Sequence, residues 1–420
     1  MQVLSPAGNF EKLLFAIKYG ADEVYLGYKK FSLRAKASGF SLEELKKAVD
    51  YAHKHNTKVF LTLNIFAHNK DIEEIEKFLK DLKSQEIFVD AFIISDLGVF
   101  SLAQEYFPEI PIHISTQANV CNYKTIEFYK KLGAKRVNLA RELSLKEIKE
   151  IREKVKDMEL ELFGHGAMCV AYSGRCLLSY FLNQVYPNKG ECTQVCRFGF
   201  YLFEKERFEK LLEKEIIKRD ELLKHTFFFL EDDEEKRISY ILNSKDLWTM
   251  PILDKIFDLN IDSLKIEGRM KSSYYVALTT AAYKQALLDL KKSKEIFKKN
   301  KEKYIKILLE VSHRPYHTGF LEENPEEYIF DSKYIKSYKF LGYFQEDGFM
   351  RVKDRFKVGD IIEAVYPSLE IKKYKVREIT RFHKGEAIKI NEAHPNFMVK
   401  LKLDPDEKIE PYIIIRKKQS

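Results

Sequence analysis

The chain has 420 residues, of which 45% are hydrophobic and 32% charged, and this composition is typical of a globular protein and excludes a disordered or fibrous one. No run approaches about 18 consecutive apolar residues, so we expect no membrane-spanning helix. The formal net charge is +8, and the N-terminal MQVLSPAGNF lacks the basic and apolar regions of a signal peptide, so we expect a cytoplasmic protein.

The first 160 residues alternate between short β-branched or apolar runs and stretches with helical periodicity. Helix starts are marked by capping boxes, one formed by Ser41 and Glu44 and another that begins at Ser144. Regular alternation of strand and helix predicts a parallel sheet covered by helices. Seven strands are expected in this part, near Val3, Val24, Val59, Phe92, Ile112, Val137 and Leu160.

An eighth strand is expected at Ser263–Glu267, after a long interruption. Eight β/α units predict an α/β fold of the TIM type, a (β/α)8 barrel, rather than an open sheet. The segment Ser5-Pro-Ala-Gly-Asn after the first strand is not the GxGxxG loop of a doubly wound dinucleotide-binding sheet. A helix from Tyr274 to about Leu290 is expected to close the barrel, and a Lys-rich helix follows to about Val311.

Residues 164–245 interrupt this rhythm. They hold four cysteines, a charged helical run at Phe208–Arg219, the segment Phe227–Leu230 and an acidic run at Glu231–Glu235. An insertion of this size after the seventh strand is expected to lie over the catalytic face of the barrel.

From Tyr338 onward the pattern changes to short strands separated by turn residues. It predicts a small antiparallel β-barrel of about 80 residues. We therefore divide the chain into a barrel domain at 1–310 with its insertion at 164–245, a linker at 311–337 and a C-terminal β-barrel at 338–420. Residues 331–420 carry a net charge of +6, which points to RNA or another polyanion, although a Lys-rich surface of a soluble protein explains it as well.

The four clustered cysteines are Cys169, Cys176, Cys192 and Cys196, with intervals of six, fifteen and three residues. In a reducing compartment such clusters favour a metal centre or catalysis over disulfides. The intervals fit the tight C-x2-C knuckles of structural zinc poorly, so we favour a [4Fe–4S] cluster over zinc or unligated thiols. Cys121 lies outside this spacing and is interpreted as a small buried hydrophobic residue.

The segment around the first two cysteines, Glu161-Leu-Phe-Gly-His-Gly-Ala-Met-Cys-Val-Ala-Tyr-Ser-Gly-Arg-Cys-Leu-Leu-Ser, resembles the signature of peptidase family U32. Further blocks agree, among them Leu4–Asn9, Ala21–Gly27, Ser115–Asn119, Asn243–Leu247 and Ser263–Arg269. The resemblance covers almost the whole chain, including the C-terminal module. The charged insert near Phe208–Lys224 is longer than the family's usual hairpin.

The resemblance implies two functions. The historical one is proteolysis, with some members described as collagenases. The layout is most similar to the branch that hydroxylates the wobble uridine of tRNA at C5 and depends on prephenate, while related branches modify 23S rRNA cytidine or hydroxylate ubiquinone without oxygen. These branches imply a four-cysteine iron–sulfur centre.

The sequence offers little for proteolysis. It contains neither HExxH nor G-x-S-x-G. A Cys–His pair could be formed by Cys169 and His165, but a thiolate that ligates a metal is not free to attack a peptide. His165 is therefore interpreted as a candidate catalytic residue or as a residue that orients the cysteine loop.

Residues at the carboxyl ends of barrel strands face the active site of a TIM barrel. Arg141 and Arg269 are expected there and could bind carboxylates, as in prephenate, or phosphates; structural salt bridges are the alternative. Lys265 and Glu267 alternate with apolar residues and are expected to point inward. The catalytic candidates are thus Arg141, His165, Lys265, Glu267 and Arg269, and the substrate-binding candidates are Tyr25, Asn64 and Gln117, with Asn64 and Gln117 alternatively filling the barrel interior.

We therefore predict an enzyme that hydroxylates tRNA, with tRNA and a small anionic co-substrate as partners and no membrane. The first alternative is a U32 protease acting on protein. The second is a non-catalytic RNA-binding protein with a structural metal.

Overall fold

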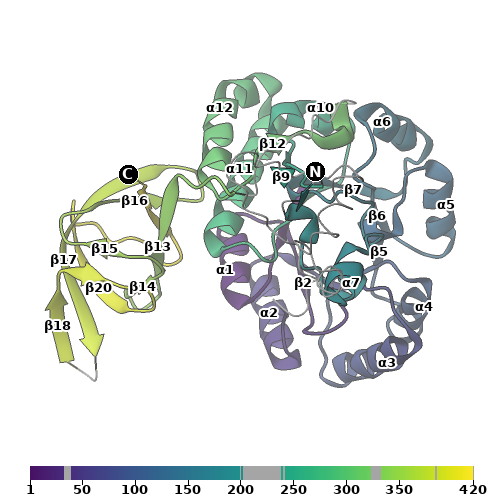
Figure 1. The fold of residues 1–420 in the computed structure, drawn as a ribbon, viewed down its shortest axis with the longest axis horizontal. Helices are drawn as coiled ribbons and strands as arrows, with labels where there is room; N and C mark the ends of the chain where they lie inside the picture. Colours follow the sequence, from purple (N-terminus) through teal and green to yellow (C-terminus); the bar gives the residue numbers. More distant parts are fainter. Residues whose placement is uncertain are drawn as a thin grey trace, which may run out of the picture.

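The computed structural model describes residues 1–32, 39–198, 200–201, 238–239, 242–322, 333–383 and 386–419. Figure 1 shows two bodies side by side: a ring of helices around a central group of strands, and a smaller body built of strands that carries the C-terminus. The predicted segments Phe208–Arg219, Phe227–Leu230 and Glu231–Glu235 lie outside the described residues. No described helix is long and apolar enough to cross a bilayer.

The larger body is a closed barrel of eight parallel strands, as predicted. Each strand pairs with the next along the chain, and pairing of the last strand with both the seventh and the first closes the ring. All eight predicted strands are present. They are β1 (Gln2–Pro6), β2 (Glu23–Gly27), β3 (Lys58–Leu63), β4 (Ala91–Ile94), β5 (Ile112–Ile114), β6 (Arg136–Asn138), β7 (Glu159–Ala167) and β11 (Ser263–Ile266).

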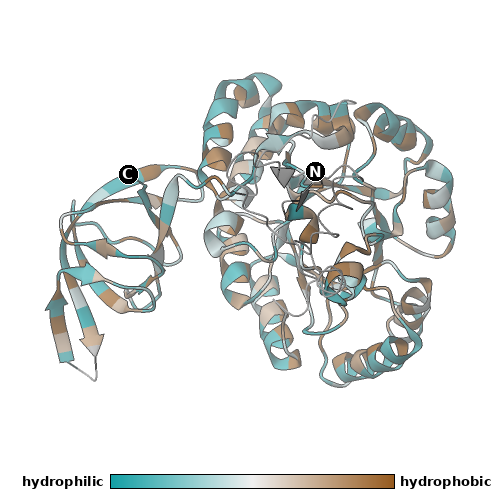
Figure 2. Cartoon of the chain, viewed as in Figure 1, coloured by the Kyte–Doolittle hydropathy of each residue, from teal (hydrophilic) through white to brown (hydrophobic). Residues whose placement is uncertain are grey.

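Amphipathic helices surround this barrel, and Figure 2 shows hydrophobic and hydrophilic residues alternating along them. Both predicted capping boxes are formed, at Ser41 and Glu44 and at Ser144 and Glu147. The helices are α1 (Phe10–Lys18), α2 (Leu42–Lys54), α3 (Asn69–Ser84), α4 (Leu97–Tyr106), α5 (Tyr123–Lys131), α6 (Leu145–Lys154), α10 (Leu253–Asp258), α11 (Ser273–Lys292) and α12 (Lys294–Glu310). The helix predicted to close the barrel is α11, and 15 of its 20 residues are buried.

Two short strands extend the barrel sheet beyond β7. Strand β10 (Asp246–Trp248) pairs antiparallel with β7, and β12 (Tyr316–His317) pairs parallel with β10. Arg314, which is fully buried, donates to Asp246 and to Asn243. Residues that follow α12 are thereby fixed to the barrel sheet before the chain enters the second body.

The smaller body is a closed antiparallel barrel of six strands, β16-β21-β13-β14-β20-β17, with β18 as an added strand on β17. This agrees with the predicted C-terminal β-barrel, and it has a hydrophobic core of its own. Its strands are β13 (Tyr338–Phe344), β14 (Met350–Val352), β15 (Phe356–Lys357), β16 (Ile361–Val365), β17 (Ile371–His383), β18 (Glu386–Ile390), β19 (Glu392–Ala393), β20 (Met398–Asp404) and β21 (Ile414–Lys418).

Buried polar contacts fix the two bodies together. The guanidinium of Arg416 lies 2.7 Å from Glu310 of α12 and 3.0 Å from Glu363 of β16, and it donates to the hydroxyl of Tyr274. The Tyr19 hydroxyl donates to the Val365 carbonyl at 2.6 Å and accepts from the backbone N–H of residue 414 at 2.8 Å. Because these groups are buried and satisfied only by each other, the arrangement of the two barrels is built into the fold.

The Arg416 contact gives a stability prediction. Replacing Arg416→Met removes a buried cation and leaves the Glu310 carboxylate buried without its ion pair, which typically costs about 3–5 kcal/mol. We expect the first transition in urea-induced unfolding to move to lower denaturant concentration. The matched control is Lys372→Met, which removes a cation from an exposed pair with Glu407 and should leave the transition in place; equal effects of the two changes would contradict the anchoring role.

Candidate active site at the barrel mouth

A cavity of about 160 Å³ opens at the carboxyl ends of the barrel strands. Ten predicted site residues line it, and they lie in or just after β2, β3, β5, β6 and β11 and in the segment that follows β7. They are Tyr25, Asn64, Gln117, Arg141, Lys265, Glu267, Arg269, Cys169, Cys192 and Cys196. The structure thus brings together nearly all of the side chains that strand alternation places at the mouth; Cys176 and His165 are not part of the lining.

Arg141 holds the cysteine segment and points its charge into this cavity. Its guanidinium donates to the Ala167 carbonyl at 2.9 Å and to the Ser173 hydroxyl at 2.7 Å. Both acceptors are neutral, and among the described residues no ion pair includes Arg141. The buried Nε has no partner. A guanidinium at the mouth whose hydrogen bonds go to neutral acceptors is suited to binding an anion.

Two further cations lie beside it and are anchored differently. Arg269 is buried and donates to the hydroxyls of Thr62 at 3.1 Å and Ser32 at 3.2 Å. Lys265 forms a buried ion pair with Glu161 at 3.0 Å, and its ammonium lies 4.6 Å from the ring centre of Tyr25. The cavity lining therefore contains the paired ammonium of Lys265 and the guanidinium groups of Arg141 and Arg269.

Gln117 follows β5 and is 2% exposed, yet neither its amide oxygen nor its amide nitrogen has a partner. A buried amide without partners costs free energy unless a ligand or water satisfies it. Asn64 lies nearby and donates weakly to Ser115 at 3.4 Å. On the other side, the Tyr25 hydroxyl donates to the Ile266 carbonyl at 3.0 Å and approaches the Glu267 carboxylate at 3.3 Å.

The cysteine segment covers one side of the cavity. All five cysteines are described, and none forms a disulfide. Burial raises the pKa of the Cys176 thiol, and it raises that of Cys196 to about 11 with a contribution from each of the other three clustered cysteines. Cys196 therefore lies close enough to the other three thiols for their charge to affect it. Among the described residues, however, no group of three His, Cys, Asp or Glu side chains could hold a single metal ion.

His165 differs from its expected position. Strand alternation would point it into the mouth, but a β-bulge in β7 adds one residue, so that Lys265 pairs with Phe163 and Ile266 pairs with His165. The bulge turns His165 to the outer face of the barrel, where it is buried and lies 3.2 Å from the Tyr316 hydroxyl and 3.3 Å from the Tyr283 hydroxyl. Burial lowers the pKa of His165 to about 3, so the ring is neutral near pH 7.

A polar network inside the barrel was not among the residues predicted from the sequence. Arg136 forms buried ion pairs with Glu23 at 2.7 Å and Glu161 at 3.4 Å, and Glu161 also accepts from Lys265. Glu161 begins the signature segment quoted above and lies inside β7. The first residues of β2 and β6 are Glu23 and Arg136. Charged residues at inward positions of predicted strands were the signal that could have found this network.

Comparison with known sequences agrees with the resemblance to peptidase family U32. The sequence model of peptidase family U32 matches residues 8–330, and that of the U32 C-terminal domain matches residues 336–416. The chain is 36% identical over 397 residues to "tRNA hydroxylation protein P" of Escherichia coli strain K12, covering 87% of this chain and 86% of that protein.

Two further relatives show how widely the names in this group differ. The chain is 35% identical over 425 residues to "tRNA hydroxylation protein P1" of Bacillus subtilis strain 168, covering 99% of this chain and 94% of that protein. It is 32% identical over 297 residues to a protein named "Collagenase" from Porphyromonas gingivalis, covering 68% of this chain and 65% of that protein.

The position of His165 predicts a pH effect on stability. Unfolding exposes the ring, which then binds a proton below about pH 6.5, whereas the folded state stays neutral down to about pH 3. Stability should therefore fall as pH falls through this window. At pH 4.5, His165→Gln should recover about 2–3 kcal/mol of that loss, because one pKa unit corresponds to about 1.4 kcal/mol.

The measurement compares urea unfolding of wild type and His165→Gln at pH 7.5 and pH 4.5. The stability difference between the two proteins should narrow or reverse at the lower pH. His113, His313 and His317, whose pKa values burial also lowers, contribute to the pH dependence of both proteins. A difference that is the same at both pH values would show that His165 is not the buried neutral group described here.

Proposed function

Since the chain belongs to peptidase family U32 and is an enzyme of that family, we propose that it hydroxylates a uridine of tRNA. In its finer form the proposal is 5-hydroxylation of the wobble uridine in the cytoplasm, with prephenate as co-substrate. Relatives named tRNA hydroxylation proteins support the tRNA substrate, since they align with almost the entire chain.

The observation that carries this proposal is the unpartnered amide of Gln117 inside a small cationic cavity. An amide offers one donor and one acceptor side by side, which matches the donor and acceptor edge of a pyrimidine base. A volume of about 160 Å³ lies below the range of about 300–1,000 Å³ typical of drug-sized ligands. It is suited to one pyrimidine ring, which must leave its stack to enter, as in other enzymes that modify bases.

The cysteine chemistry supports an iron–sulfur cluster at this mouth. Soft thiolates are the ligands of such clusters, and Cys169, Cys176, Cys192 and Cys196 would provide all four. The intervals of six, fifteen and three residues between these cysteines differ from the tight C-x2-C knuckles of structural zinc sites. When bound, a cluster supplies redox chemistry beside the cavity, and the residues of the chain orient the base and neutralise anions.

Prephenate dependence is supported by the cations. Prephenate is a dicarboxylate, and guanidinium groups bind carboxylates through paired hydrogen bonds. Arg141 has only neutral acceptors among the described residues, and Arg269 lines the same cavity. Because the cavity has space for about one ring, base and co-substrate would occupy it in turn, or the cysteine segment would move to admit both.

The described residues give no support to a Cys169–His165 peptidase. Cys169 lines the cavity, but the bulge in β7 turns His165 to the outside, where tyrosine hydroxyls are its partners. A general base must reach its nucleophile within hydrogen-bond distance or through one water. The name of the Porphyromonas gingivalis relative is therefore not extended to this chain.

The proposal predicts a loss of modified tRNA in cells. Mass spectrometry of tRNA nucleosides should show that a strain lacking the gene loses 5-hydroxyuridine derivatives and that the wild-type gene restores them. In strains complemented with Gln117→Leu or Arg141→Gln, their level should be at least tenfold lower than with the wild-type gene. These changes remove the amide edge or the cation from the cavity lining, and circular dichroism of the purified variants checks that the fold is kept. Matched controls are Gln104→Leu on α4 and Arg377→Gln on β17, both exposed and far from the mouth.

Restoration by all four variants would contradict the role of the mouth residues. Unchanged nucleosides in the deletion strain would contradict the proposed function itself. The peptidase alternative would instead be established if purified protein cleaves casein, if Cys169→Ser abolishes this cleavage, and if the tRNA nucleosides do not change in the deletion strain.

The metal centre has a separate test. Anaerobically purified protein should contain about four irons per chain, as expected for a [4Fe–4S] centre. Cys176→Ser should lose the cluster as fully as Cys169→Ser, although Cys176 does not line the cavity, whereas Cys121→Ser should retain it. Stoichiometric zinc without iron, or full iron in Cys176→Ser, would show that the four cysteines do not bind one cluster.

A further inference from the structure

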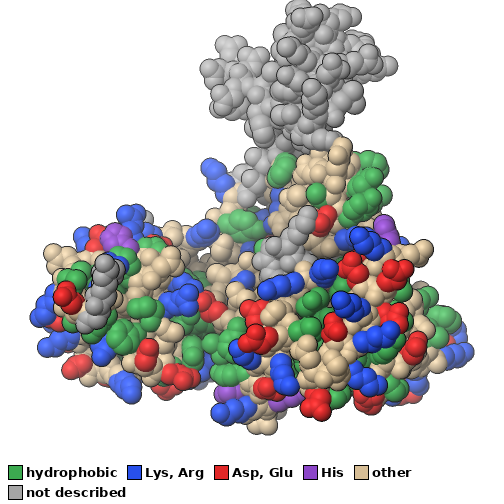
Figure 3. Space-filling view, turned by 90° about the horizontal axis from the view of Figure 1, so that it is seen from below, with side chains coloured by type: hydrophobic (Ala, Val, Ile, Leu, Met, Phe, Trp, Pro, Cys, Tyr) green, Lys and Arg blue, Asp and Glu red, His purple; other side chains and the backbone are tan. Residues whose placement is uncertain are grey.

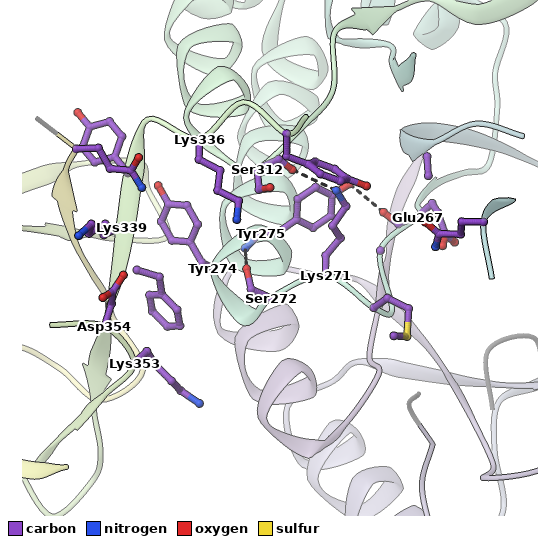
Figure 4. Close-up of a pocket in the computed structure, with 18 of the residues that line it drawn as sticks. Glu267, Lys271, Ser272, Tyr274, Tyr275, Ser312, Lys336, Lys339, Lys353 and Asp354 are labelled. Atoms are coloured by element: carbon purple, nitrogen blue, oxygen red, sulfur yellow. Dashed lines mark hydrogen bonds between the residues drawn. The ribbon is translucent and has the colours of Figure 1, made fainter. Parts of the chain in front are cut away.

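A second and larger cavity, of about 570 Å³, lies in the cleft between the two barrels. In Figure 4, Lys336 and Lys339 lie on the side of the C-terminal module, Lys271 and Glu267 lie on the side of the (β/α)8 barrel, and Tyr274 and Tyr275 lie between them. We call this cavity the interdomain groove. Its volume is more than three times that of the mouth cavity.

The groove leads to the mouth. Four residues line both cavities: Ala167, Gln194, Arg197 and Glu267. Two of them, Gln194 and Arg197, flank Cys196 in the cysteine segment, so this segment forms the boundary between the two spaces. A polymer that lies in the groove can therefore place one of its units in the mouth cavity.

The groove is positively charged. Its lining contains five cations, from Arg197, Lys271, Lys336, Lys339 and Lys353. Only two carboxylates line it, those of Glu267 and Asp354. Lys336 and Lys339 are exposed, and within the described part of the chain neither takes part in an ion pair. Figure 3 shows Lys and Arg side chains spread over both bodies. The groove therefore differs from the remaining surface because its cations line a concave cavity.

Aromatic rings alternate with these cations. Tyr334, Tyr338 and Phe340 are partly exposed in the lining. The Lys271 ammonium lies 4.2 Å from the ring centre of Tyr334, and Arg197 donates to the Tyr334 hydroxyl at 2.7 Å. A concave surface that combines cations for phosphates with rings on which bases stack is the common feature of sites for single-stranded nucleic acid. An acidic peptide would use the cations but not the rings.

The groove exists before any ligand binds. Its two walls belong to different bodies, and the buried contacts of Arg416 and Tyr19 described above fix those bodies in place. The ligand does not have to close the cleft, so its binding energy is not spent on ordering the two domains.

We propose that the interdomain groove binds a single-stranded segment of RNA, and that its phosphates contact Lys336 and Lys339 while the adjoining nucleotide enters the mouth cavity. This rests on the proposed function, and it assigns the path of the substrate strand. The C-terminal module thereby acts in recognition through one face of β13 and the residues just before it.

The test is the salt dependence of RNA binding by the full-length, cluster-loaded protein. The probe is a fluorescently labelled anticodon stem–loop, and its affinity is measured by anisotropy at several KCl concentrations. Lys336→Gln combined with Lys339→Gln should weaken binding at least tenfold at low salt. The slope of log K against log salt should become shallower by about 1.4, because each lost contact with a single strand accounts for about 0.7.

The matched control combines Lys373→Gln with Lys375→Gln on β17, both exposed on the module and outside the groove. It changes the net charge equally and should keep the wild-type slope. Equal slopes in the two double variants would overturn the proposal, because the charge effect would then be non-specific. The single-strand assignment would also be overturned if an RNA duplex binds as tightly as the stem–loop and if its binding depends equally on Lys336 and Lys339.

A failure of the groove proposal can be distinguished from a failure of the proposed function. If tRNA hydroxylation is found in cells but the groove variant binds RNA with wild-type affinity and slope, the groove proposal fails alone. If the groove variant loses RNA binding but tRNA nucleosides do not change in the deletion strain, the proposed reaction fails and the RNA site stands.

Discussion

The pairing of β7 with β11 is the contact on which the remaining structure depends. About a hundred residues separate the two strands, and their pairing closes the barrel. The bulge in β7 sits in this pairing and requires glycine on both sides of His165. A Cβ on Gly164 would lie 2.4 Å from Leu264, and Gly166 has a φ of +114° with its Cβ position 2.5 Å from the Glu267 carbonyl oxygen. The carbonyl of Gly164 accepts from the Thr249 and Tyr283 hydroxyls, so this carbonyl of the bulge is hydrogen-bonded.

Charge is arranged in layers along the axis of the same barrel. Glu161 lies between Arg136 below and Lys265 above, and this interior is neutralised because unpaired buried charges are costly. At the mouth the charges are not paired in this way, since Arg141 donates hydrogen bonds to neutral acceptors and the side-chain amide of Gln117 has no hydrogen-bond partner. Two of the buried groups without a hydrogen-bond partner, the Gln117 amide and the Arg141 Nε, thus belong to residues that line the mouth cavity. The neutral interior keeps the orientation of Lys265 fixed while the mouth remains available for an anion or a base.

Much of this could be predicted from the sequence, because local patterns determine it. Short β-branched or apolar runs located all eight barrel strands, and the strand at Tyr338–Phe344 was predicted with its observed limits. The rule that the carboxyl ends of barrel strands face the active site placed Arg141, Lys265 and Arg269 at the mouth. It failed for His165, because a bulge reverses the alternation and depends on long-range packing against Thr249 and Tyr283. The interdomain groove could not be predicted, since Lys271 and Lys336 are brought together only by the contacts between the two barrels.

The most direct test of the account is the structure of the iron-loaded protein bound to a tRNA anticodon stem–loop, determined by electron cryo-microscopy or crystallography. The account predicts one uracil ring extruded into the mouth cavity, hydrogen-bonded to the Gln117 amide and beside the cluster held by the four cysteines. Its flanking phosphates should lie along Lys336 and Lys339. A stem–loop bound elsewhere on the protein, with its bases stacked and no base in the mouth, would contradict it.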